Sequence, residues 1–229
     1  MKTLIHKSVR NALALSASLA CLSVAFAEDK KPNYDAAGRF HIYSKEAPTG
    51  AMPFIPYGFM PTEAAQMVKM DTECKVKPNP EEGEKPGEGV CIKVAITWAK
   101  PFWCGVGFFS GPGDPPYWWG DDDRGNHYDF SGLKKKKLVF YARGETGKER
   151  IQVKFGILGD KKYGDSTKFP GETRWLKLMP EWQRFELPLD KYKSSDLSRI
   201  ANAFTFVAEK IQQDGTGDTV FYLDTITLE

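Results

Sequence analysis

The sequence predicts an all-β fold, a jelly-roll β-sandwich of two antiparallel sheets. From residue 39 onward, short runs of β-branched and aromatic residues alternate with turn residues, which is typical of short strands joined by tight connections. Amphipathic helical periodicity is nearly absent, and the chain shows no internal repeat. About ten strands in one such chain favour a sandwich or a jelly roll.

Each predicted strand is a run of apolar or aromatic residues bounded by turn residues. The clearest runs are residues 90–98, 137–143, 150–158, 174–178, 183–189, 203–208 and 219–228. Weaker runs are residues 40–43, 67–71 and 105–109. In residues 151–157 the apolar side chains occupy alternate positions, as a strand with one buried face requires.

The last predicted strand carries a charge in an apolar row. At alternate positions, the residues that share a face with Asp224 are Val220, Tyr222, Ile226 and Leu228. Burying an unpaired carboxylate is costly, so Asp224 requires a partner. Arg143, which follows the alternation of its own strand, is one candidate partner. A structural calcium ion is the other.

The first 27 residues have the composition of a secretory signal peptide. Basic residues precede an apolar stretch at 12–25, and small residues at positions 25 and 27 supply a cleavage site. The stretch is too short and too rich in serine for a membrane helix, so we expect no transmembrane segment. Cys21 offers an alternative lipoprotein cleavage site. We therefore expect a secreted or periplasmic protein, with association with the cell surface as an alternative.

Cleavage after residue 27 divides the chain into three expected parts. They are a signal peptide at 1–27, a flexible lead-in at 28–38 and the β-sandwich domain at 39–229. The signal peptide contains three of the 32 basic residues and no acidic residue, which leaves 29 basic against 30 acidic residues and a net charge of −1. Such a domain has no general field that attracts nucleic acid, and we expect no nucleic-acid partner.

Three cysteines remain after cleavage. Cys74 and Cys91 flank a segment rich in Pro, Gly, Glu and Lys, and in an oxidising compartment they are expected to form a disulfide. Closing a loop of this length stabilises the fold by about 3 kcal/mol. Cys104 is then the odd cysteine, which we expect to be a small buried apolar residue.

Several short motifs resemble the secreted galactose-binding-like β-sandwiches related to carbohydrate-binding modules. In order along the chain they are FWCGV at 102–106, WG at 119–120, YDFSG at 128–132, LVFYARGE at 138–145, EWQRF at 181–185 and TVFYLDTI at 219–226. The resemblance implies a jelly roll, glycan recognition and a structural calcium ion associated with Asp224. Family members often carry two consecutive acidic residues before the isoleucine, whereas this chain has Thr225 at the second position.

A candidate binding site lies in the Gly- and Pro-rich segment at 110–128, which is expected to form a loop. Sugar recognition uses flat aromatic faces for the C–H surface of a pyranose ring and polar groups for its hydroxyls. The segment supplies both, and Trp175 is expected to join them. The candidate ligand-binding residues are Tyr117, Trp118, Trp119, Asp121, Arg124, Asn126 and Trp175.

The other tryptophans have separate expectations. Trp182 precedes a regular strand and is expected in the core. Trp98 ends one predicted strand and Trp103 begins the next, so either residue packs inside or lines a groove.

These patterns predict a non-catalytic carbohydrate-binding module. Neither a nucleophile elbow nor an HExxH motif is present, so we expect no enzyme. The first alternative is a structural or assembly protein of the cell envelope or extracellular matrix, because protein interfaces also favour Trp, Tyr and Arg. The second is a divergent glycosidase or lyase, since paired carboxylates can hydrolyse glycosides.

Overall fold

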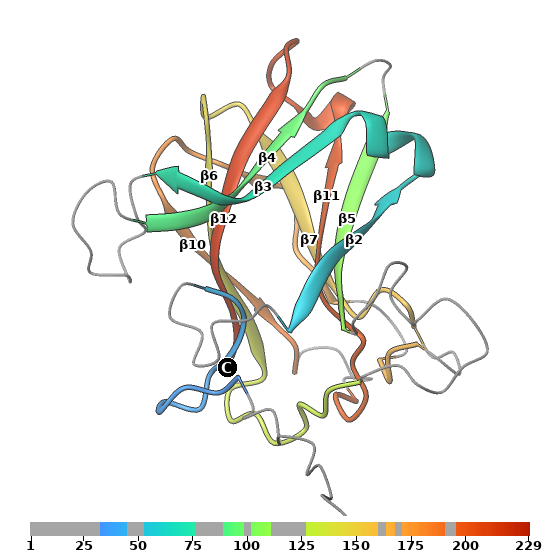
Figure 1. Ribbon diagram of the computed structural model, residues 1–229, viewed down its shortest axis with the longest axis vertical. Helices are drawn as coiled ribbons and strands as arrows, with labels where there is room; N and C mark the ends of the chain where they lie inside the picture. Colours follow the sequence, from blue (N-terminus) through green and yellow to red (C-terminus); the bar gives the residue numbers. More distant parts are fainter. Residues whose placement is uncertain are drawn as a thin grey trace, which may run out of the picture. The chain divides into compact units, whose positions relative to one another are not determined.

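The computed structural model describes residues 33–44, 53–76, 89–98, 102–110, 127–159, 164–167, 171–190 and 196–229. These residues form two antiparallel β-sheets, which confirms the predicted β-sandwich (Figure 1). The helical elements among them are the short 3-10 turns η1 (Thr62–Gln66) and η3 (Lys210–Gln212). In the described part of the chain, no helix has the length and apolarity needed to cross a membrane.

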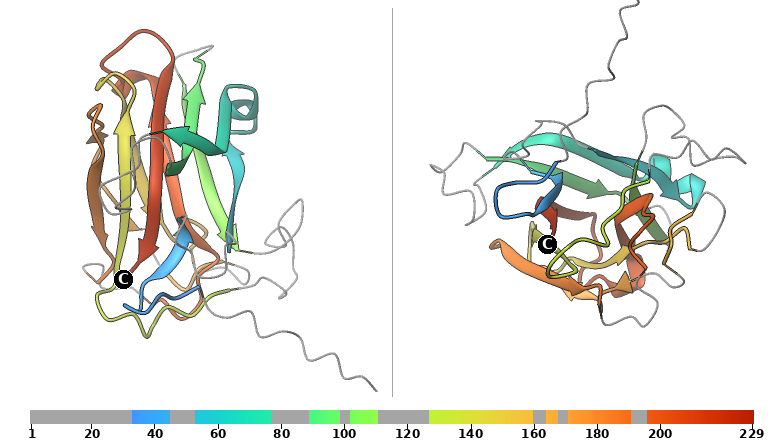
Figure 2. Two further views of the ribbon diagram at one scale, coloured as in Figure 1. Left: turned by 60° about the vertical axis from the view of Figure 1, so that its left-hand side comes forward. Right: turned by 90° about the horizontal axis from the view of Figure 1, so that it is seen from below.

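The first sheet, sheet A, contains six strands. In spatial order they are β10 (Gln183–Pro188), β6 (Lys137–Gly144), β12 (Thr219–Leu228), β4 (Gly89–Ile96) and β3 (Val68–Val76), with β1 (Phe40–Tyr43) also paired to β12. The first and last strands of the domain therefore lie side by side (Figure 2).

The second sheet, sheet B, also contains six strands. In spatial order they are β2 (Phe54–Met60), β5 (Trp103–Ser110), β11 (Asn202–Glu209), β7 (Arg150–Phe155) and β8 (Gly171–Glu172), with β9 (Leu176–Lys177) paired to β7. Strand β2 was not predicted, because Pro56 and Gly58 interrupt its apolar run.

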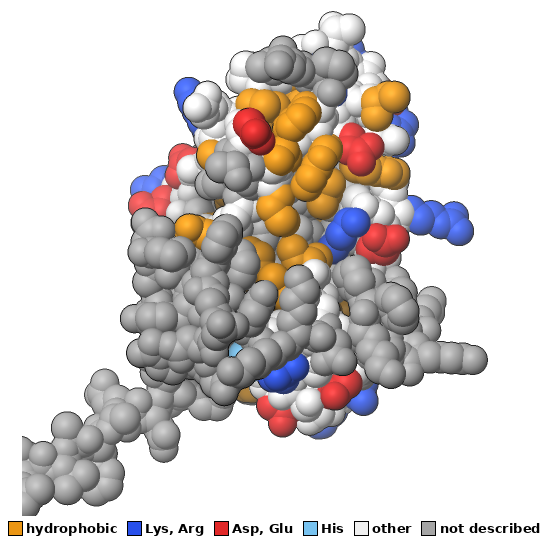
Figure 3. Space-filling view, turned by 90° about the vertical axis from the view of Figure 1, so that its right-hand side faces the viewer, with side chains coloured by type: hydrophobic (Ala, Val, Ile, Leu, Met, Phe, Trp, Pro, Cys, Tyr) orange, Lys and Arg blue, Asp and Glu red, His pale blue; other side chains and the backbone are white. Residues whose placement is uncertain are grey.

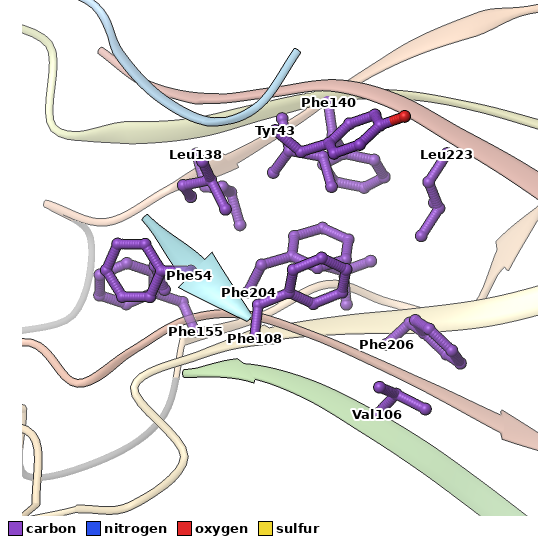
Figure 4. Packing of buried hydrophobic residues seen from close by; sticks show 14 of the residues in the cluster. Tyr43, Phe54, Val106, Phe108, Leu138, Phe140, Phe155, Phe204, Phe206 and Leu223 are labelled. Atoms are coloured by element: carbon purple, nitrogen blue, oxygen red, sulfur yellow. The ribbon is translucent and has the colours of Figure 1, made fainter. Parts of the chain in front are cut away.

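The core lies between the two sheets and is rich in phenylalanine. Alternation along each strand directs one set of side chains inward; in β7 these are Ile151, Val153 and Phe155, as the sequence predicts. Rings from sheet A meet rings from sheet B edge to face, for example Phe140 with Phe204 at 5.5 Å between centroids. Figure 4 shows this packing. Such pairs add about 0.5–1.5 kcal/mol each to the burial of the rings.

Of the residues predicted to share a face with Asp224, Tyr222 does so, but Ile226 and Leu228 do not, because β12 contains a bulge. Thr225 has φ +43°, and the register with β6 shifts between Asp224 and Thr227. The extra residue reverses the alternation, so the inward residues are Phe221, Leu223, Ile226 and Leu228. Asp224 therefore lies on the outer face of sheet A, where it is 1% exposed and its Oδ1 accepts the N–H of Thr225 at 2.7 Å.

Residues 33–38, for which a flexible lead-in was expected, fold against β1. Tyr34 pairs with Phe40 as an isolated bridge. Asp35 accepts hydrogen bonds from the backbone and side chain of Arg39 and contacts His41 Nε2 at 3.1 Å. The signal peptide and residues 28–32 lie outside the described residues.

The predicted disulfide is not formed in the structure. Cys74 of β3 lies directly opposite Cys91 of β4, but both are free thiols. Burial raises the pKa of the Cys91 thiol, and the neighbouring Cys74 raises it further. The expected partners are therefore adjacent, and their oxidation stays a prediction. Cys104 is buried in the core, as expected.

Candidate functional site

Strand β5 exposes an aromatic side on the outer face of sheet B. Its inward side chains in the core are Cys104, Val106 and Phe108. Alternation therefore directs Trp103, Gly105, Gly107 and Phe109 outward. Trp103 is 41% exposed, whereas Phe109 is almost fully buried. An exposed tryptophan on a regular strand is unusual, because this side chain is normally well buried.

Strand β2 extends this apolar face on the neighbouring side. Ile55 lies opposite Phe109 and is 39% exposed, and Tyr57 lies opposite Gly107 and is half-buried. The space-filling view of this side of the molecule shows a band of hydrophobic side chains with charged side chains around it (Figure 3). We call the set of outward residues the platform; it consists of Ile55, Tyr57, Trp103, Gly105, Gly107 and Phe109.

The two glycines keep the platform flat. A Cβ atom at Gly107 would overlap the ring of Phe109, so this ring lies along the sheet only because the position has no side chain. A Cβ atom at Gly105 would lie 3.1 Å from the backbone oxygen of Phe206, which is tight. Glycine in a strand interior often marks the close approach of a ring, a backbone or a ligand. Here both glycines are buried, and the ring of Phe109 lies against Gly107.

Polar side chains border the platform on the β7 side. Across the sheet, Gly107 is followed by Thr205 of β11, Lys154 of β7 and Glu172 of β8. Lys154 and Glu172 form an ion pair at 3.2 Å. In the adjacent row, Gln152 of β7 lies opposite Val207. One side of the surface is therefore aromatic and aliphatic, and the other side offers donors and acceptors.

This division of the surface suits a ligand with an apolar face and a polar edge. A pyranose ring is such a ligand, since its C–H groups pack on aromatic rings and its hydroxyls take planar polar partners.

The buried thiol of Cys104, next to Trp103 in the sequence, is inert, because burial raises its pKa to about 12.

Most of the sequence-predicted site lies outside the described residues. This applies to the loop residues Tyr117, Trp118, Trp119, Asp121, Arg124 and Asn126. Trp175 is described and half-buried, in the stretch between β8 and β9. Strands β11 and β7 separate it from Trp103, so the two tryptophans do not share one platform.

The remaining two tryptophans lie next to strands of sheet A. Trp98 donates from Nε1 to Thr219 Oγ1 at 2.8 Å and packs against the core. Trp182 was expected in the core but is half-buried, and the guanidinium carbon of Arg143 lies 5.7 Å from its ring centroid. Strand β10 begins at Gln183, so its start at the rim of sheet A keeps Trp182 near the surface.

Calcium at Asp224 stays a prediction. Calcium takes six to eight oxygen ligands, several of them from carboxylates. Within the described residues, no group of three or more His, Cys, Asp or Glu side chains gathers as metal ligands. Tyr141 of β6 lies opposite Asp224, and the negative charge of Asp224 contributes to raising the pKa of the Cys91 thiol. Arg143, the other expected partner, lies opposite Tyr222, which shares the outer face with Asp224.

Comparisons with known proteins found distant similarities to solved structures. No family model matches the chain, and no curated protein matches it. A family 11 carbohydrate-binding module from Clostridium thermocellum, solved with a β-1,3-1,4-mixed-linked tetrasaccharide, is 15% identical with a TM-score of 0.49, over 83% of this chain and 94% of that chain. The family 30 module of a cellulosomal cellulase from Clostridium thermocellum is 13% identical with a TM-score of 0.48, and the match covers 83% of this chain and 96% of that chain.

A longer protein is also similar over one part. An exo-β-agarase is 10% identical with a TM-score of 0.44, and the match covers 82% of this chain and 24% of that chain. The similar structures thus include carbohydrate-binding modules. Identity this low does not carry the binding properties of those modules to this chain.

Proposed function

We propose that this protein is an exported, non-catalytic carbohydrate-binding module that holds a glycan on the platform of sheet B. The observation that carries the proposal is Trp103, a ring 41% exposed on a regular strand beside Gly105, which adds no side chain to cover it. A sugar ring stacked on Trp103 places its hydroxyls toward Gln152 and Lys154. The aromatics at 117–119 follow β5 in the sequence and provide further contacts in this proposal.

Affinity in such a site comes from aromatic contact and a few hydrogen bonds. We expect dissociation constants between micromolar and millimolar. Trp103→Ala removes the exposed ring and is expected to weaken binding by about tenfold or more, since an aromatic contact contributes about 1–3 kcal/mol. Met179→Ala is the matched control, because Met179 is 43% exposed but lies beyond β9.

The test uses the mature chain on a glycan array, followed by calorimetry with the best oligosaccharide. Binding that Trp103→Ala weakens and Met179→Ala leaves unchanged supports the platform. Binding unchanged in Trp103→Ala contradicts it. Turnover of the bound glycan contradicts the non-catalytic part of the proposal.

A second function is favoured by Ile55, an aliphatic side chain 39% exposed beside the rings. Exposed aliphatic patches also mark contacts between proteins. In this alternative, the platform binds another protein of the envelope or matrix. Light scattering of the purified chain separates the two: stable multimers at low micromolar concentration that Ile55→Glu dissociates favour assembly, and a monomer at all concentrations favours the glycan.

A further inference from the structure

Two cations flank one tyrosine on the outer face of sheet A. Tyr222 of β12 lies directly opposite Arg143 of β6 on one side and Lys93 of β4 on the other. The guanidinium carbon of Arg143 lies 4.3 Å from the centroid of the Tyr222 ring, and Lys93 Nζ lies 5.8 Å from it. The electron-rich ring stabilises both positive charges. The three side chains thus form one row across the strands.

The guanidinium group of Arg143 has donors to spare. Its Nη1 donates to the backbone oxygen of Pro180 at 3.1 Å. Its Nε is buried and has no hydrogen-bond partner in the described part of the chain. Nε itself is out of reach of a ligand, so a ligand oxygen would be met by the terminal Nη groups, whose bond to Pro180 is exposed. The centroid of the Trp182 ring lies 5.7 Å from the guanidinium carbon.

The carboxylate next along the strand is already engaged. Glu145, two residues beyond Arg143, accepts the hydroxyl hydrogen of Tyr222 at 2.7 Å. Burial and this hydrogen bond raise the pKa of Tyr222 to about 12, so its hydroxyl stays neutral. Asp71 of β3 lies opposite Lys93 at the far end of the row. Tyr222 is only 4% exposed, so the row offers a ligand its two cations and the half-buried ring of Trp182.

We propose that Arg143, Lys93 and Trp182 form a binding site for the carboxylate of a uronic acid residue in an acidic polysaccharide. The planar fork of a guanidinium matches a carboxylate better than a point charge does, and Lys93 adds a second positive charge. The sugar ring packs on Trp182. This site extends the proposed function to acidic glycans, but it uses sheet A and is independent of the platform on sheet B.

The test is calorimetry of the mature chain with tetragalacturonate and with the neutral galactose tetrasaccharide. We expect only the acidic probe to bind in a manner that depends on Arg143. Arg143→Gln is expected to weaken binding at least about tenfold, and Lys93→Gln about three- to tenfold. Arg143→Lys is also expected to weaken it, since it keeps the charge but loses the fork. Arg184→Gln, on β10 of the same sheet, is the matched control, because Arg184 is paired with Glu186.

Urea unfolding of each variant shows whether its fold is intact, and Lys93→Gln tests the site if Arg143 variants unfold. The proposal is overturned if the wild type does not bind tetragalacturonate. It is also overturned if Lys93→Gln and a folded Arg143→Gln bind tetragalacturonate with the same affinity as the wild type. If the wild type binds a sulfated tetrasaccharide as tightly as tetragalacturonate, the assignment to a carboxylate is overturned. Loss of acidic binding in Trp103→Ala but not in Arg143→Gln overturns this site and retains the platform. Acidic binding that depends on Arg143, with no neutral glycan bound, retains this site and contradicts the platform.

Discussion

Asp165 ties two distant segments of the domain together through one buried carboxylate. Its Oδ1 accepts the backbone N–H groups of Ala201 at 2.7 Å and Asn202 at 2.9 Å. Its Oδ2 accepts the N–H of Leu158 at 2.9 Å. The residue is fully buried. Asp165→Ala therefore leaves three donors at the ends of β7 and β11 without their acceptor.

The loss can be estimated from these three contacts. Each unsatisfied buried donor costs about 1–3 kcal/mol, and hydrogen bonds to a charged group lie toward the upper end. Some relief comes from water, because Leu158 lies in a turn that is half-buried. We expect Asp165→Ala to lower the free energy of unfolding by about 3–5 kcal/mol. In a domain of this size, that lowers Tm by about 10 °C.

Asp165→Asn is the matched control. Burial raises the pKa of Asp165 although the three N–H groups oppose it, so a neutral side chain avoids part of the desolvation cost. Asn keeps one oxygen for Ala201 and Asn202 and loses the acceptor for Leu158. Its expected cost is therefore smaller, about 1–3 kcal/mol. Urea unfolding followed by circular dichroism measures both variants. A loss below about 1 kcal/mol in Asp165→Ala would refute the reasoning.

Three further predictions concern other positions. Burial acts to raise the pKa of Asp35, but hydrogen bonds from Arg39 and a neighbouring histidine outweigh it and lower this pKa to about 2. Asp35→Asn should therefore cost about 1 kcal/mol at pH 7, after allowance for solvent screening, and the difference in urea unfolding should shrink as pH falls from about 4 to 2. Thiol counting on exported protein should show Cys74 and Cys91 oxidised; three free thiols would contradict the disulfide. If Asp224 binds calcium, as the sequence predicts, the Tm of the protein should fall when EDTA is added and recover when calcium is restored. An unchanged Tm counts against calcium binding.

Much of the fold follows from local patterns in the sequence. Strands β1 and β12 have the predicted bounds, because each is rich in β-branched and aromatic residues and lies between polar residues. The missed strand β2 contains Pro56 and Gly58, which usually end strands. Only the pairing of β2 with β5 across the sheet overrides this local signal, and pairing is a long-range property.

The candidate site was less predictable. Trp103 was identified as a residue that packs or lines a groove. The glycines at alternate positions, Gly105 and Gly107, were a signal for a flat outer face that was not used. Tyr57 and Ile55 were missed together with β2. The row around Tyr222 was hidden by the bulge at Thr225, since a strict period of two assigns Asp224 to the inner face. A bulge depends on a single backbone angle that side-chain periodicity does not encode.

The bulge also makes the last strand sensitive to changes in length. Ile226 and Leu228 lie in the core only because Thr225 is an additional residue in β12. Deleting Thr225 would remove the additional residue and leave Ile226 and Leu228 on the inner face of a regular strand. Deleting or inserting one residue elsewhere in β12 would instead turn the residues on one side of the change toward water. Insertions and deletions should therefore be tolerated in the loops of this domain but not within β12 away from the bulge, where the reading frame of the strand determines which residues form the core.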